Sequence, residues 1–70
     1  MYILKLKDKD DTVTTMEHEY HKPLELFLFN QVTLEGLYIK GSVYNLTDKK
    51  IIAEAKPNEY TRSNNGFKIS

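Results

Sequence analysis

Cysteine and tryptophan are absent from the 70-residue sequence, and glycine and proline are scarce, with three and two residues respectively. Without cysteine, neither a disulfide framework nor a thiolate zinc site can stabilise the fold. A domain of this size buries only ~60% of the surface that its unfolded chain exposes, so it has room for one small core. We therefore expect a single domain, residues 1–70, that is stabilised by packing alone or by packing and self-association.

Long apolar segments are also missing. No stretch approaches the ~18 residues that a membrane-spanning helix needs, and the segment from Met1 to Lys5 lacks the basic and apolar regions of a signal peptide. We therefore expect a cytoplasmic protein that does not act at a membrane. Phe, Tyr, Met, Ile, Asn and Lys, whose codons are AT-rich, far outnumber Gly, Ala, Arg and Pro. This bias predicts an AT-rich bacterial genome, or a phage or mobile element of such a host.

Neither sign of charge predominates, because ten lysine or arginine residues balance ten acidic residues. Proteins that bind nucleic acid through its phosphates rely on a positive field and on counterion release. Neutrality therefore argues against nucleic-acid binding without excluding it. The balance is uneven along the chain: the first 35 residues hold four lysines and seven acids, and the last 35 hold six basic residues and three acids.

Alternation of apolar and polar side chains predicts an all-β fold. In the run from Tyr2 to Lys7, Tyr2, Leu4 and Leu6 share one face, which is the period of a half-buried strand. Turn-forming residues separate this run from further strand-like runs. Strand-like runs cover residues 2–7, 12–21, 24–29, 37–46, 51–55, 60–63 and 67–70, of which those between residues 12 and 30 also fit a helix, with turns at 8–11, 47–50, 56–59 and 64–66. Five or six such strands forming a sheet indicate a small twisted sheet or an SH3/OB-like barrel.

Two segments between residues 12 and 30 also fit a short helix. We favour a strand over residues 12–21 because the segment begins with β-branched residues, although a helix would align Val13, Met16 and Tyr20. The apolar run of residues 24–29 predicts a central strand that is covered on both faces. Its periodicity fits one or two helical turns as well. On a strand, its two phenylalanines would share one face and need cover from another element or another chain.

Residues 37–46 form the clearest predicted strand. One face of this strand carries aliphatic side chains and the other carries tyrosine, lysine and serine; they are Leu37, Ile39 and Val43, and Tyr38, Lys40, Ser42 and Tyr44. Gly41 lies inside the strand and has no side chain to pack. We therefore expect a bulge, a bend or a close approach of another segment at this position.

Residues that could carry out catalysis are few. His18 and His21 are potential metal ligands, but on a strand they point to opposite faces, and the sequence has no third histidine. There is no cysteine nucleophile, no glycine-rich phosphate loop and no nucleophile-elbow motif. We therefore predict no enzymatic activity, no catalytic residue, no metal ligand and no cofactor.

What remains is a function exerted by surface contact. We predict a non-enzymatic protein–protein interaction module, such as a phage or mobile-element accessory protein that binds a host protein as an inhibitor or modulator. Aromatic anchors and lysines would form its partner-binding surface, namely Tyr38, Lys40, Tyr44, Phe27 and Phe29.

Two alternatives stay open. The first is a small β domain that binds single-stranded nucleic acid, in which aromatic rings stack on bases and basic side chains follow the phosphates. Its surface would comprise Tyr38, Lys40, Tyr44, Lys49, Lys50, Tyr60 and Arg62. The second is a structural homo-oligomer, such as a homodimer that buries the two phenylalanines.

Overall fold

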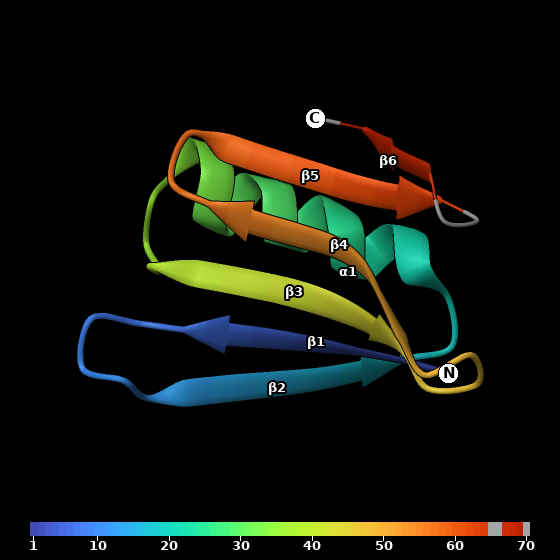
Figure 1. Ribbon diagram of the computed structural model, residues 1–70. Coiled ribbons are helices and arrows are strands. Elements are labelled where there is room, and N and C mark those ends of the chain that lie inside the picture. The colour runs from blue at the N-terminus through green and yellow to red at the C-terminus, as the bar shows by residue number, and fades with distance from the viewer. Residues whose placement is uncertain (65–66, 70) are drawn as a thin grey trace.

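Figure 1 shows the computed structural model of the protein, which describes residues 1–64 and 67–69. Its six strands are β1 (Tyr2–Lys7), β2 (Val13–His18), β3 (Lys40–Asn45), β4 (Lys50–Lys56), β5 (Glu59–Asn64) and β6 (Phe67–Ile69). They form one antiparallel sheet in the order β2-β1-β3-β4-β5-β6. Two consecutive short helical segments cover a single face of this sheet. The predicted small, mostly β fold is confirmed, as an open sheet whose edges in the described part of the chain are β2 and β6.

The first hairpin forms where the sequence predicts it. β1 and β2 pair in regular register from Tyr2–His18 to Lys7–Val13, so the strand predicted within residues 12–21 is confirmed for Val13–His18. Its predicted end is wrong, because His21 already begins a helix. Asp8 organises the turn between the two strands, because its carboxylate accepts the backbone N–H groups of Asp10 (2.9 Å) and Thr12 (3.1 Å). Short acidic side chains commonly stabilise turns in this way.

The apolar run that we favoured as a central strand is helical, so that prediction is wrong and the alternative of a short helix between residues 12 and 30 is confirmed. Helix α1 (His21–Leu28) contains Pro23 in its first turn, where the missing N–H would have no partner within the helix. Leu24, Leu28 and Val32 recur every four residues, and all three are buried. This spacing creates one apolar helical face. The periodicity of residues 24–29 allows a strand or a helix, and packing of this apolar face against the sheet favours the helix.

The helix widens before it ends. α1 continues into a π-helical segment, η1 (Phe29–Leu34), and the Glu35 N–H donates to the Asn30 carbonyl five residues earlier, at 2.9 Å. Gly36 then adopts a positive φ of 66°, which is common at the residue that follows a helix. Neither helical segment in the described part of the chain is long and apolar enough to cross a lipid bilayer.

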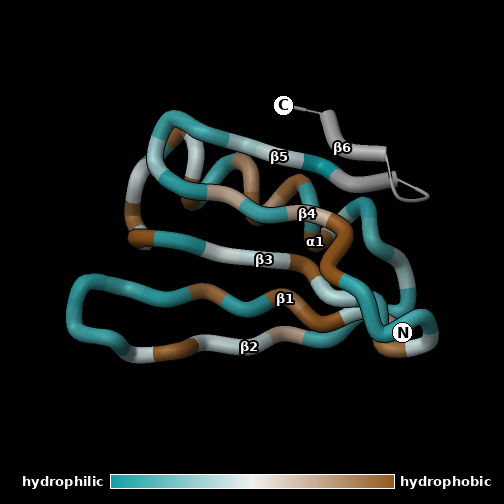
Figure 2. The backbone as a smooth tube through the Cα atoms, viewed as in Figure 1, coloured by the Kyte–Doolittle hydropathy of each residue, from teal (hydrophilic) through white to brown (hydrophobic). Residues whose placement is uncertain are grey.

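The hydrophobic core lies between the helical layer and one face of the sheet. It comprises Leu4, Leu6, Leu24, Leu28, Val32, Val43, Ala53 and Ala55. The alternation of these residues with polar ones is visible along β1 in Figure 2. A Cβ atom on Gly41 would lie 2.5 Å from Leu28 Cδ1 and 2.8 Å from Leu6 Cδ2. Gly41 therefore permits the close approach of α1 to the sheet, one of the three roles that we expect for it.

Strand β3 is shorter than predicted and begins at Lys40. Tyr38 precedes the strand and packs against the core, so our prediction that it shares a face with Lys40 is wrong. Between Val43 and Tyr44 the register with β4 shifts, and this irregularity lets Ile52 pack against the core while Ile51 lies on the other face.

The remaining hairpins agree with the turn signals. Pro57 and Asn58 connect β4 to β5, and Asn58 has a positive φ of 65°. Strands β5 and β6 pair in antiparallel fashion through Asn64–Phe67. The predicted turn residues Asn65 and Gly66 lie outside the described residues.

Candidate functional site

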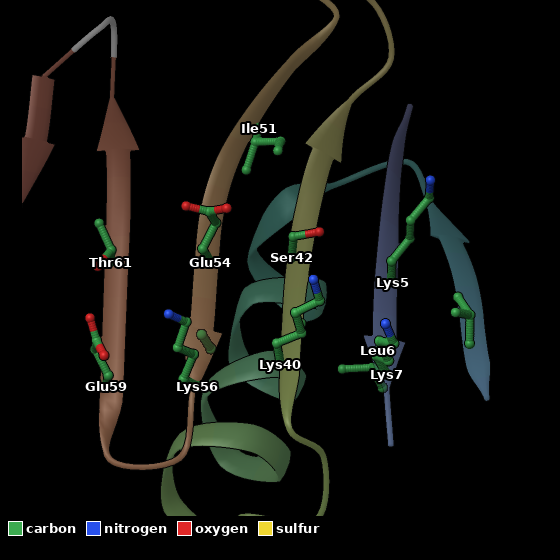
Figure 3. Close-up of a pocket in the computed structure, with 13 residues that line it drawn as sticks. Lys5, Leu6, Lys7, Lys40, Ser42, Ile51, Glu54, Lys56, Glu59 and Thr61 are labelled. Atoms are coloured by element: carbon green, nitrogen blue, oxygen red, sulfur yellow. The ribbon is translucent and has the colours of Figure 1, made fainter. Parts of the chain in front are cut away.

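The sheet face opposite the helix carries three rows of side chains that cross neighbouring strands. Figure 3 shows most of the side chains of the first two rows. Directly paired residues of a sheet have their side chains on the same face, so the register defines these rows. The lysine row contains Val13, Lys7, Lys40, Lys56 and Glu59. The middle row contains Thr15, Lys5, Ser42, Glu54 and Thr61. The apolar row contains Glu17, Ile3, Tyr44 and Ile51.

The lysine row places like charges at adjacent positions. Lys7 lies opposite Lys40, and extension of the Gly41–Ala55 pair by one residue places Lys56 on the other side of Lys40. Directly opposed Cβ atoms are ~5 Å apart. Even in water, two ammonium groups ~8 Å apart repel each other by ~0.5 kcal/mol. The row is therefore unfavourable for folding unless anions lie close to it.

Internal compensation for this repulsion is incomplete, although Glu59 lies opposite Lys56 in the same row. Lys7 pairs with Asp11 at 3.4 Å, but the Asp11 side chain is 77% exposed, which makes the pair weak. The ion pairs among the described residues involve neither Lys40 nor Lys56. Lys5 adds a fourth ammonium group from the middle row, and Figure 3 shows all four lysines projecting from the same side of the sheet. This end of the open face thus holds an excess of positive charge.

A depression of about 590 Å³ follows the lysine and middle rows and is broadly open to solvent. The stems of Lys5, Lys7, Lys40 and Lys56 form its walls, and Ser42 lies within it. Glu54 and Glu59 also line it, so the surface is mixed in charge, with lysine in excess. Its chemistry suits the recognition of carboxylates or phosphates by ammonium groups on flexible stems.

The apolar row lies at the other end of the same face. Tyr44 is half-buried between its strand neighbours Ile3 and Ile51, and Ile51 is 47% exposed. Met1 and Leu46 lie at this end of the sheet as well, because the Leu46 N–H donates to the Met1 carbonyl at 3.1 Å. The open face therefore combines a cationic end with an end that is apolar apart from Glu17.

A second cluster lies on the opposite face and joins α1 to β5. The buried Glu25 carboxylate accepts hydrogen bonds from Arg62 Nε (2.7 Å) and from the Tyr60 hydroxyl (3.1 Å), and it pairs with His21 Nδ1. Burial raises the pKa of Glu25, but the hydrogen bonds from Arg62, His21 and Tyr60 outweigh burial and hold that pKa below its ordinary value.

The same contacts keep Tyr60 and Arg62 protonated, so that both donate to Glu25. Burial and the Glu25 charge raise the pKa of Tyr60, and the hydrogen bond to Glu25 raises the pKa of Arg62. Tyr60 and Arg62 from β5 thus donate to Glu25 Oε1, and His21 from α1 pairs with Glu25 Oε2. This arrangement suits a structural tie between the helix and the sheet.

The residues that we predicted as interaction surfaces are divided between the two sides of the molecule. Lys40 and Tyr44 lie on the open face, in the lysine row and the apolar row. Lys49 and Lys50 are exposed at the connection from β3 to β4. The structure therefore brings part of the predicted set together around the open face.

The other predicted residues lie on the helix side. Phe27 and Tyr38 pack against the core. Phe29 contacts Tyr60 edge to face, with ring centroids 5.3 Å apart. Tyr60 and Arg62 both bind Glu25. These aromatic and basic side chains do not form one platform with those of the open face.

Sequence reasoning missed three lysines of the open face, Lys5, Lys7 and Lys56. Lys5 and Lys7 alternate with Leu4 and Leu6, so their common face could be found from periodicity. Their position beside Lys40 depends on the pairing of β1 with β3, which are more than 30 residues apart in the chain. No local signal shows that pairing.

Comparisons of the chain with protein families, curated proteins and solved structures give no match. The function must therefore be argued from the geometry of the open face.

Proposed function

We propose that the protein is a non-enzymatic module that binds a partner protein through the open face of its sheet. The lysine row is the observation that carries this proposal. Lys7, Lys40 and Lys56 occupy adjacent positions on three neighbouring strands, and they repel one another. An anionic partner surface would relieve this repulsion. The positive field of the lysines would also attract such a surface over a distance.

A protein fits this face better than a nucleic acid does. Glu54 and Glu59 lie among the lysines, and the phosphates of a strand that crossed the face would meet both carboxylates. Stacking of bases also needs exposed aromatic rings. Of the predicted aromatic residues, only Tyr44 belongs to the open face.

A different protein fits better than a second copy of this chain. In a two-fold symmetric contact, both partners present the same patch. A contact centred on the lysine row would therefore oppose lysines to lysines. We propose a host protein as the partner and a phage or mobile-element accessory protein as the binder, which acts in the cytoplasm. The AT-rich codon bias of the sequence supports this origin.

Site-specific photocrosslinking tests the proposal. A photoreactive amino acid in place of Ser42 lies at the centre of the open face, and the same amino acid in place of Leu26, which is 64% exposed on α1, is the matched control. In host cells, we expect a discrete protein adduct from position 42 that Lys40→Glu abolishes and that position 26 does not give. The absence of an adduct from position 42, or an equal adduct from position 26, would overturn the proposal. An adduct that nuclease removes would favour nucleic-acid binding instead.

A further inference from the structure

The two ends of the open face differ in chemistry, and this difference specifies what the partner presents. We infer that the face binds an acidic segment that also carries an apolar anchor. This inference rests on the proposed function and adds the chemical class of the partner.

The acidic part of the partner follows from the charge of the lysine and middle rows. Four lysines and two glutamates belong to these rows, which leaves an excess of two positive charges. Two or more carboxylates of a partner would neutralise this excess. A polyphosphate chain is charged at every unit, so its phosphates would also meet Glu54 and Glu59. Ser42 and Thr61 supply hydroxyl groups between the lysines and can donate to the same carboxylates.

The apolar anchor follows from the other end of the face. Ile51 is 47% exposed, and it lies beside Tyr44 and Ile3 on neighbouring strands. Large aliphatic or aromatic side chains of a partner would bury this area, and such buried anchors carry most of the affinity in protein interfaces. The nearby Met1 and Leu46, 53% and 38% exposed, extend the apolar area.

The register sets the distance between the two parts of the partner. Lys7 and Ile3 lie four residues apart on β1, which corresponds to ~13 Å along a strand. A partner segment therefore needs about four residues between its acids and its anchor if it is extended, or about nine if it is helical. This spacing distinguishes a specific partner from a protein whose surface is merely acidic.

Selection from a displayed random peptide library tests the inference without a known partner. We expect the wild-type protein to enrich peptides with a net negative charge and a separate apolar or aromatic residue. Synthetic copies of these peptides should bind Lys40→Glu at least about tenfold more weakly, since like charges then oppose each other. Lys22→Glu makes the same charge change on α1, behind the sheet, and is expected to leave the affinity within about twofold.

The apolar end has its own matched pair of variants. Ile51→Thr keeps a β-branched side chain on β4 but shortens the exposed apolar surface, and we expect about a tenfold loss of affinity. Leu26→Ala removes a more exposed aliphatic side chain from α1 and should leave the affinity unchanged. Melting curves of all four variants show whether each is folded.

The outcomes separate this inference from the proposed function. If peptides bind the open face but are neutral or basic, or bind Lys40→Glu as well as wild type, the acidic segment is wrong and the interaction module stands. If Ile51→Thr binds as tightly as wild type, the anchor is wrong. If no peptide is enriched, or if the enriched peptides map to another surface, both fail.

Discussion

Glu25→Gln removes one charge from the cluster that joins α1 to β5. The Glu25 side chain is 11% exposed and contacts Arg62, Tyr60 and His21. Breaking a buried ion pair costs ~3 to 5 kcal/mol. The Arg62 side chain is 33% exposed, however, so water can compensate part of the interaction that Arg62 loses with Glu25. A hydrogen bond to a charged group is worth ~1.5 to 3 kcal/mol, and we therefore expect Glu25→Gln to lower the free energy of unfolding by ~2 kcal/mol at pH 7.

The pH dependence distinguishes the loss of charge from a packing defect. The pKa of Glu25 lies below its ordinary value of 4.5 in the folded protein, so the carboxylate stabilises the fold above about pH 4.5. This contribution is lost as the pH falls through the folded-state pKa. The difference between wild type and Glu25→Gln should thus be largest at neutral pH and should shrink in acid.

Urea denaturation of both proteins at several pH values between 3 and 7 measures this difference. Glu54→Gln is the control, because Glu54 is exposed on the open face and should change stability by less than about 0.5 kcal/mol. A deficit for Glu25→Gln that stays the same from neutral to acidic pH would refute a role for its charge. A deficit no larger than that of Glu54→Gln would refute the cluster as a tie between helix and sheet.

Three further substitutions test the packing and the open face. Gly41→Ala should destabilise the fold by ~1 to 3 kcal/mol in urea denaturation, because its Cβ would lie 2.5 Å from Leu28 Cδ1; combination with Leu28→Val should cost less than the sum of the two changes, and simple additivity would contradict the clash. Thr33→Val should cost ~1 kcal/mol, because the Thr33 hydroxyl donates to the Glu59 carbonyl at 2.9 Å; an unchanged melting temperature would show that this bond contributes nothing. Lys40→Glu should raise stability by ~0.5 kcal/mol at low salt, with a smaller gain at high salt; a loss of stability would contradict repulsion within the lysine row.

The parts of the fold that local chemistry determines could be predicted from the sequence. The strand from Tyr2 to Lys7 follows from alternation, and the turn after it follows from short acidic side chains. The helix could not be predicted in this way. The six apolar or acidic residues after Pro23 fit the period of a helix as well as that of a strand. Buried Val32, which completes the apolar face of the helix, lies beyond these six residues.

The open face could be predicted only in part, because it depends on pairing between distant segments. Lys40 and Tyr44 share a face through alternation within β3. Lys7 and Lys56 join Lys40 because β3 lies between β1 and β4 in the sheet. That strand order follows from the crossing of α1 over one face, which returns the chain beside β1 instead of β2. Because we predicted residues 24–29 as a strand, this strand order could not be derived from the sequence.

Backbone amide chemical shifts during titration with a selected peptide test the central claim most directly, because they show which face of the sheet the partner contacts. We predict that the largest changes fall on the open-face residues of β1, β3 and β4, among them Lys5, Lys40 and Ser42, with small changes in α1. Changes that concentrate on α1 instead, or no change at saturating peptide, would contradict binding through the open face.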